Sequence, residues 1–166
     1  MMPFTSSQPQ DLLFDAARRG DLDLLTDLLG RQVDVDTRDG RGFSPLILAT
    51  YEGHLEASRL LLDAGAQVNL QDHSGNTALM GVSFKGYPEI GRLLIDRGAD
   101  LNLQNGSGGT ALMFATMFGR TAMVELLVAH GADRDLRDSR GLTVLEMARR
   151  IGNEEALPFL QPQAES

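Results

Sequence analysis

The sequence contains no cysteine and no tryptophan, and aromatic residues make up only 5% of its 166 residues. Without cysteine the chain has no disulfide, no thiol catalysis and no cysteine-ligated zinc. Lysine is nearly absent too: Lys85 is the only lysine among 15 Lys and Arg residues, and the formal net charge is −8. An acidic chain lacks the basic face that binds phosphates, so we expect no nucleic-acid partner.

Long apolar runs are also missing. No segment approaches the roughly 18 apolar residues of a membrane span. The first ten residues lack the basic start and the apolar run of a signal peptide. We therefore expect a cytoplasmic protein without membrane contact. The excess of arginine over lysine is typical of a high-GC genome and favours a bacterial source.

What the chain does have is an internal repeat of 33 residues with no insertion or deletion. Two of the recurring series are glycine at Gly20, Gly53, Gly86, Gly119 and Gly152, and leucine at Leu13, Leu46, Leu79, Leu112 and Leu145. Units of this length complete one another's core by stacking. We expect one domain over residues 1–166, with repeats at 6–38, 39–71, 72–104, 105–137 and 138–166.

Each repeat is predicted to hold two helices followed by an extended loop. In the second repeat, Ser44 is a good N-cap and Pro45 suits the first helical position. Gly53 ends this helix as a left-handed residue would, and Gly65 ends the next one. The expected caps recur at the same phase in the following repeats, at Ser44, Thr77, Thr110 and Thr143.

The segments FSPLILATYEGHLEASRLLLDAGAQVNLQD, GNTALMGVSFKGYPEIGRLLIDRGADLNLQN and GTALMFATMFGRTAMVELLVAHGADRDLRD resemble ankyrin repeats. The resemblance covers the chain after residue 6. It implies an all-α solenoid of helix-turn-helix units with β-hairpin-like finger loops, in a small stand-alone protein of bacterial type with about five repeats. The polar first and last repeats are typical of caps, which indicates a self-contained, monomeric array.

The sequence departs from that pattern at several places. The helix start of an ankyrin repeat usually ends in a histidine that ties neighbouring loops together. Ile47, Met80, Met113 and Glu146 stand there, so we expect this hydrogen-bond network to be absent and apolar packing to replace it. In the last repeat we expect Asn153 to cap the second helix and Pro158 to kink or end it.

The third repeat carries two glycines inside its predicted helices, Gly81 and Gly91. One interpretation is a hinge or a close helix contact. The other is sequence drift, with Phe114 or Met80 filling the gap beside Gly81. Replacing Gly91 by alanine separates the two, because alanine stabilises a merely soft helix.

Candidate chemistry is weak throughout. His54, His73 and His130 fall at three different phases of the repeat and should not converge on a metal. The segment NGSGGT resembles a phosphate-binding loop but lacks the lysine and the preceding strand. We therefore expect no enzyme, no metal and no cofactor.

Function is then expected on the surface. In ankyrin repeats the variable exposed positions are the finger loops and the ends of the first helices, which line the concave face. We predict that a partner protein binds there. The candidate residues are Arg18, Arg19, Arg41, Phe43, Tyr51, Glu52, Phe84, Lys85, Met117, Phe118 and Arg150. Aromatic, Met and Arg side chains are typical of interface hot spots.

Two roles fit such a surface. The first is a non-catalytic protein-interaction module that scaffolds or masks a partner. The alternative is an inhibitor, an immunity protein or an accessory factor of one enzyme. The acidic net charge favours a partner with a basic patch, whereas the arginines at both ends of the predicted face favour acidic groups. The sequence leaves this conflict open.

Overall fold

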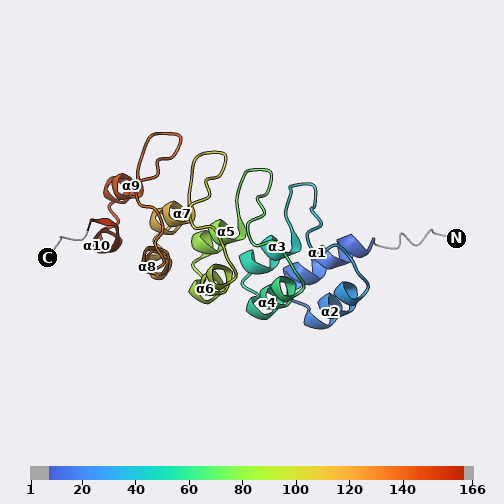
Figure 1. The fold of residues 1–166 in the computed structure, drawn as a ribbon. Coiled ribbons are helices and arrows are strands. Elements are labelled where there is room, and N and C mark those ends of the chain that lie inside the picture. The colour runs from blue at the N-terminus through green and yellow to red at the C-terminus, as the bar shows by residue number, and fades with distance from the viewer. Residues whose placement is uncertain (1–7, 163–166) are drawn as a thin grey trace.

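The computed structural model describes residues 8–162, and within them the chain forms ten helices and no strand (Figure 1). The helices are α1 (Pro9–Arg19), α2 (Leu22–Gly30), α3 (Pro45–Tyr51), α4 (Leu55–Asp63), α5 (Ala78–Lys85), α6 (Pro88–Asp96), α7 (Ala111–Met117), α8 (Thr121–Ala129), α9 (Val144–Ile151) and α10 (Leu157–Leu160). The predicted all-α solenoid is confirmed. Residues 6–7 and 163–166, at the outer ends of the first and last expected repeats, lie outside the described part.

The helices form two parallel rows. The odd-numbered helices α1 to α9 make an inner row, and the even-numbered helices α2 to α10 make an outer row (Figure 1). In both rows the extensive contacts are between consecutive members. The loops that lead into α3, α5, α7 and α9 project from the same side as four fingers (Figure 1). The inner helices and the fingers therefore border one long surface.

Local signals set where the inner helices begin. The hydroxyl oxygens of Ser44, Thr77, Thr110 and Thr143 accept the third amide of their helices at 3.2, 3.2, 3.2 and 3.3 Å. All four predicted N-caps are confirmed. Leucine and alanine then fill the core, as expected for a chain with few rings. The recurring Leu13, Leu46, Leu79 and Leu112 are buried.

All five glycines of the 33-residue series have a left-handed backbone, which favours glycine, and at some of them a neighbouring side chain also occupies the space of a β-carbon. At Gly20 the backbone is left-handed, with φ of 68°, and a β-carbon would lie 2.6 Å from the His54 ring. That ring donates to the carbonyl oxygen of Arg18 at 2.9 Å. Arg120 repeats the arrangement two repeats later, because it covers Gly86 and donates to the Phe84 carbonyl at 2.9 Å. Each such side chain joins its own repeat to the one before.

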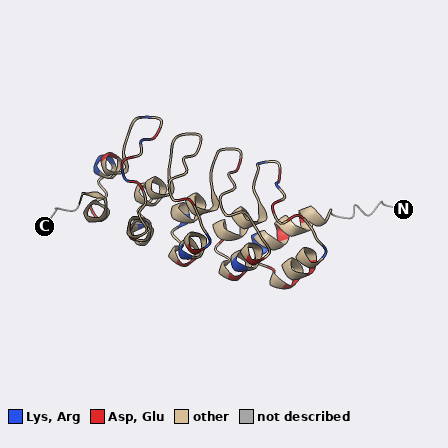
Figure 2. Ribbon diagram, in the orientation of Figure 1, with Lys and Arg blue, Asp and Glu red and all other residues tan. Residues whose placement is uncertain are grey.

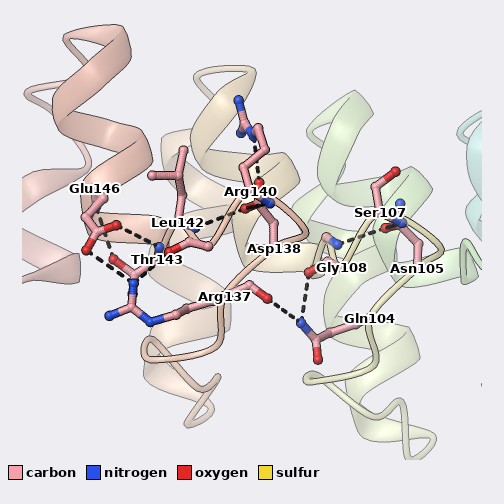
Figure 3. A network of polar contacts seen from close by, with 12 residues as sticks. Gln104, Asn105, Ser107, Gly108, Arg137, Asp138, Arg140, Leu142, Thr143 and Glu146 are labelled. Carbon is pink, nitrogen blue, oxygen red and sulfur yellow. Dashed lines mark hydrogen bonds and ion pairs between the residues drawn. The ribbon is translucent and has the colours of Figure 1, made fainter.

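Hydrogen bonds from residues other than histidine tie the fingers together, so the expectation that apolar packing replaces the histidine network is corrected. Gln71, Gln104 and Arg137 share one phase of the repeat and supply it. The Gln104 side-chain amide donates to Gly108 of its own finger and to the Arg137 carbonyl of the next, both at 2.9 Å (Figure 3). Gln71 does the same toward Gly75 and Gln104, at 2.8 and 3.3 Å. Side-chain amides of the loops therefore supply hydrogen bonds between fingers where no histidine is present.

The last repeat also differs from expectation. Residues 154–156 form turns, and α10 has only four residues. Pro158 lies in the first turn of that helix, where its missing N–H costs nothing, so it neither kinks nor ends a longer helix. Asn153 accepts from the Ala156 amide at 3.3 Å and donates to the Thr116 carbonyl at 2.8 Å. It therefore caps a turn and joins the last repeat to its neighbour.

Candidate protein-interaction surface

The C-terminal ends of the inner helices present one side chain per repeat along the array. At a spacing of 33 residues these are Arg18, Tyr51, Phe84, Met117 and Arg150. Helices α3 and α7 carry no charged residue, and Lys85 is the only one on α5 (Figure 2). The middle of the inner row is therefore apolar, and basic residues stand at both of its ends.

The aromatic side chains of the middle repeats pack against one another. The rings of Tyr51 and Phe84 are stacked with centroids 6.3 Å apart, and Phe118 meets Phe84 edge-on at 4.6 Å. The ammonium of Lys85 lies 4.7 Å from the Tyr51 ring centroid, a cation–π contact. Such pairs add about 0.5–1.5 kcal/mol beyond area burial. The rings hold one another in place on the surface.

Tyr51, Met117 and Phe118 are exposed by 38, 42 and 45%, while Phe84 is half-buried between its two partners. We call these four residues the aromatic ridge. Monomeric proteins rarely expose several large apolar side chains in contact without a functional reason. The ridge is thus the strongest candidate surface in the described part of the chain.

Hollows lie between the fingers and the inner helices, and together they form a groove beside the ridge. One hollow is bordered by Arg18, Arg41, Phe43 and Tyr51. The next also includes Arg41, Phe43 and Tyr51 and reaches Phe84 and Phe114. A third includes Phe114, Met117 and Arg140. Because neighbouring hollows share residues, the groove runs along most of the array.

Most acidic groups in the groove are occupied by their own loops. One carboxylate oxygen of Asp39 accepts the amides of Arg41 and Phe43, both at 2.9 Å. Asp72 does the same for Ser74 and Asn76. Within residues 8–162, Arg18 and Arg41 are exposed and form no salt bridge; Glu52 is the exposed acid beside them. Arg18 and Arg41 are therefore available to a partner.

At Asp138 in the last finger, two effects on the carboxyl oppose each other. Burial raises its pKa, but hydrogen bonds from the Leu142 and Arg140 amides and from the Arg140 guanidinium outweigh that effect. The net pKa is lowered from the ordinary value of 3.8. The Arg140 side chain lies 3.0 Å from this carboxylate, so Arg140 is less available than Arg41.

The structure places the predicted site residues as follows. Exposed are Arg18, Arg19, Arg41, Tyr51, Glu52, Met117, Phe118 and Arg150, and half-buried are Phe43, Phe84 and Lys85. Arg19 is tied to Asp15 and Asp21 at 3.4 and 3.3 Å. Leu142 of the last finger is 7% exposed and belongs to the core.

Two residues of the groove were missed by sequence reasoning. Phe114 was considered only as a possible filler beside Gly81, but it is half-buried and borders two hollows. Gly81 borders the hollow between Tyr51 and Phe84. Both occupy one phase of the repeat, with Leu48 and Met147. The change in side-chain size between repeats at this position was the signal in the sequence that could have pointed to these two residues.

The histidines lie apart. His54 contacts the Arg18 carbonyl, His73 is on a finger, and the His130 ring donates to the Leu126 carbonyl at 2.9 Å. No group of three or more His, Cys, Asp or Glu residues suited to a metal occurs within residues 8–162. Nor does that part of the chain contain a helix with the length and apolar character needed to cross a membrane.

Comparison with known proteins agrees with this architecture. Residues 13–105 and 81–165 match the family model described as ankyrin repeats (3 copies). The human ankyrin repeat domain-containing protein 29 is 44% identical over 63 residues, which are 37% of this chain and 21% of that protein. The chain thus spans about a fifth of that relative's length. Since the family model covers nearly all of the described residues, this chain belongs to the ankyrin repeat family.

Proposed function

We propose that this protein is a non-catalytic interaction module that binds a partner protein through the groove and the aromatic ridge. Ankyrin repeats are generally protein-interaction modules. The observation that carries the proposal is the exposure of Tyr51 in the second repeat and of Met117 and Phe118 in the fourth, around the half-buried Phe84 of the third. Aromatic and methionine side chains are enriched where interfaces have their binding energy.

The dimensions suit a protein partner. Packed helices lie about 10 Å apart, so the ridge from Tyr51 to Met117 extends about 20 Å. A stable interface buries about 1,200–2,000 Å² in total. The ridge alone is too small for that, and the fingers would supply the remainder through Arg41 and Phe43. The exposed Arg18 and Arg150 at the two ends of the inner row would act as the polar rim.

A capture experiment with matched variants tests the proposal. The test variant combines Tyr51→Ala, Phe84→Ala and Phe118→Ala. The control variant combines Leu22→Ala, Arg92→Ala and Glu125→Ala, which change exposed residues of the outer helices α2, α6 and α8. Proteins captured from the source cell by the wild type and the control should be lost from the test variant. Partners that persist on the test variant would place binding elsewhere.

Folding of the test variant must be verified, because Phe84 is half-buried. Circular dichroism and thermal unfolding serve this purpose. Phe118→Glu is a second, milder variant, since 45% of the Phe118 side chain is exposed. It should fold normally and weaken binding at least about tenfold if Phe118 lies in the interface. Unchanged binding by Phe118→Glu would remove this residue from the site.

The distribution of binding energy distinguishes a scaffold from an inhibitor or accessory protein of one enzyme. An inhibitor binds through a few dominant side chains, so Phe84→Ala or Phe118→Ala alone would abolish its binding. A scaffold would tolerate either change with modest loss. The monomeric state, the cytoplasmic location and the bacterial source stay predictions from the sequence.

A further inference from the structure

One position on the inner helices differs sharply between repeats. The second, fourth and fifth repeats carry Leu48, Phe114 and Met147 at this position. The third repeat has Gly81 there, which has no side chain. Met80 and Phe114 border this position without closing it, because a surface cavity of about 400 Å³ remains beside Gly81. The nearest outside atom to a β-carbon on Gly81 would be Cδ2 of Tyr51, at 3.3 Å. We call this cavity the Gly81 pocket.

The lining of the Gly81 pocket is mostly apolar. Four aromatic residues border it: Phe43, Tyr51, Phe84 and Phe114. Met80 and Ile47 add further apolar surface. Pockets that hold a ligand group have volumes of about 300–1,000 Å³, and this one lies near the lower limit. It therefore suits a single bulky apolar side chain with its adjoining backbone.

The charged side chains at the pocket differ in whether they already have a partner within the protein. Arg41 borders the pocket, is exposed and forms no salt bridge within residues 8–162. Asp72 also borders it, but one of its oxygens accepts two finger amides at 2.9 Å. The face of Tyr51 already has the ammonium of Lys85 at 4.7 Å. A carboxylate beside the apolar group would pair with Arg41, whereas a second cation would be repelled.

The surroundings of the pocket favour an extended ligand. The hollows on either side share Arg41 and Phe43 at one end and Phe114 at the other. Adjacent inner helices lie about 10 Å apart, and an extended chain advances about 3.3 Å per residue. A strand-like segment in the groove would therefore pass one repeat about every three residues.

We propose that the Gly81 pocket receives one bulky apolar side chain of an extended acidic segment in the partner protein, with a neighbouring carboxylate paired to Arg41. This inference rests on the proposed function and names the partner chemistry of the same groove. At the pocket, Arg41 is exposed and has no ion pair within residues 8–162, whereas Asp72 accepts two amides of its own finger, so the proposal favours an acidic partner segment. The missing side chain of Gly81 is the specificity determinant.

A random library of displayed 12-residue peptides, selected on the wild-type protein, tests the inference. The selected sequences should share a Leu, Met or Phe with an Asp or Glu within about three residues of it. Fluorescein-labelled copies of the selected peptides then give dissociation constants. A consensus with Lys, Arg or methylated lysine at the anchor position would overturn the inference.

Variant proteins locate the anchor. Gly81→Leu restores the apolar residue found at this position in the second repeat, so it should raise the unfolding midpoint while weakening peptide binding at least about tenfold. Arg41→Glu should weaken binding at least about fivefold, and more at low ionic strength. The matched control is Arg92→Glu on the outer helix α6, which should leave binding unchanged. A merely structural role of Gly81 cannot give higher stability together with lost binding.

The remaining outcomes separate this inference from the proposed function. Peptides that tolerate Gly81→Leu but are lost from the Tyr51/Phe84/Phe118 triple-alanine variant would overturn the inference and leave the proposed function standing. Peptides that tolerate both variants would contradict both. If the library yields no enriched sequence, the inference is wrong, and the capture experiment still decides the proposed function independently.

Discussion

At the scale of single residues, three hydroxyls share one phase of the inner helices and do not behave alike. The O–H groups of Thr50 and Ser83 donate to the carbonyl oxygens four residues earlier, at 2.8 and 2.7 Å. The Thr116 hydroxyl is buried and has no hydrogen-bond partner within residues 8–162. A buried hydroxyl without a partner keeps the full cost of its lost hydration.

Thr116→Val should therefore leave the free energy of unfolding unchanged or raise it slightly, because valine has the same shape without the hydroxyl. The matched change Thr50→Val removes a made hydrogen bond and should cost about 0.5–1.5 kcal/mol. Urea denaturation of both variants measures the difference. Equal losses at the two sites would mean that Thr116 does have a hydrogen-bond partner in solution.

Asp138 makes the free energy of unfolding depend on pH in the acidic range. Its pKa is lowered in the folded protein, so its contribution is present above the unfolded value near 3.8 and is lost as pH falls through the lower folded value. Asp138→Asn should flatten the stability profile below about pH 4. Asparagine keeps the loop bonds, because Asn105 in the preceding finger accepts its own loop amides at 3.0 and 2.8 Å. An unchanged acid profile in unfolding experiments would contradict this assignment.

At the scale of helices, Gly91 shows why an element can need a glycine. A β-carbon there would lie 2.9 Å from Cε of Met123 and 3.2 Å from Cδ2 of Leu126, both buried on α8. Helix α6 therefore packs closely on α8, and the close-contact interpretation replaces the idea of a merely soft helix.

Gly91→Ala should fail to stabilise and should cost about 1 kcal/mol, because the overpacking of about 1–3 kcal/mol exceeds the helix-propensity gain of about 1 kcal/mol. Gly81→Ala is the matched control. Its β-carbon meets only the exposed Tyr51 ring at 3.3 Å, so it should stabilise by about 0.5–1 kcal/mol. Thermal unfolding compares the two, and a stabilised Gly91→Ala would show that Met123 yields freely.

The starts of the inner helices could be predicted from the sequence, because a single N-cap residue determines each of them. Ser44 and Thr77 each satisfy an amide of their own first turn, so local sequence determines the outcome. The finger network was not predictable in this way. Gln104 has a bond within its own finger and another to the next one, 33 residues on. Its role depends on stacking that a pattern of single repeats does not contain.

At the scale of the whole molecule, the repeats differ in how many neighbouring repeats they pack against. The helices α5 to α8 have neighbours on both sides. Within residues 8–162, the last repeat contacts one other repeat, and its second helix α10 has four residues. In arrays of this kind, stability is a sum of repeat terms and nearest-neighbour terms.

Native-state hydrogen exchange should therefore be graded. Amides of α9 and α10 should exchange at least about tenfold faster than those of α5 to α8 after correction for intrinsic rates. Mass spectrometry of peptic peptides resolves these segments. Uniform protection from α1 to α10 would mean that the array unfolds as one cooperative unit.

The candidate surface was predictable in outline. Repeat phase places Tyr51, Phe84 and Phe118 at the ends of inner helices, and two of the three are exposed by more than a third. The Gly81 pocket was not predictable, because an absent side chain leaves either a filled gap or a cavity. The orientations of Phe114 and Tyr51 decide between the two, and only the folded array fixes them.

The confinement of the extensive helix contacts to adjoining repeats has a mechanical consequence. When a force is applied between the two ends of the array, the contacts between adjoining repeats act in series, so each bears the same tension. Each 33-residue repeat that gives way would lengthen the chain by about 100 Å, since an extended residue spans about 3.3–3.6 Å. Extension would proceed one repeat at a time, starting from the repeat with the four-residue helix α10. The central repeats around Gly81 would keep their shape longest under load.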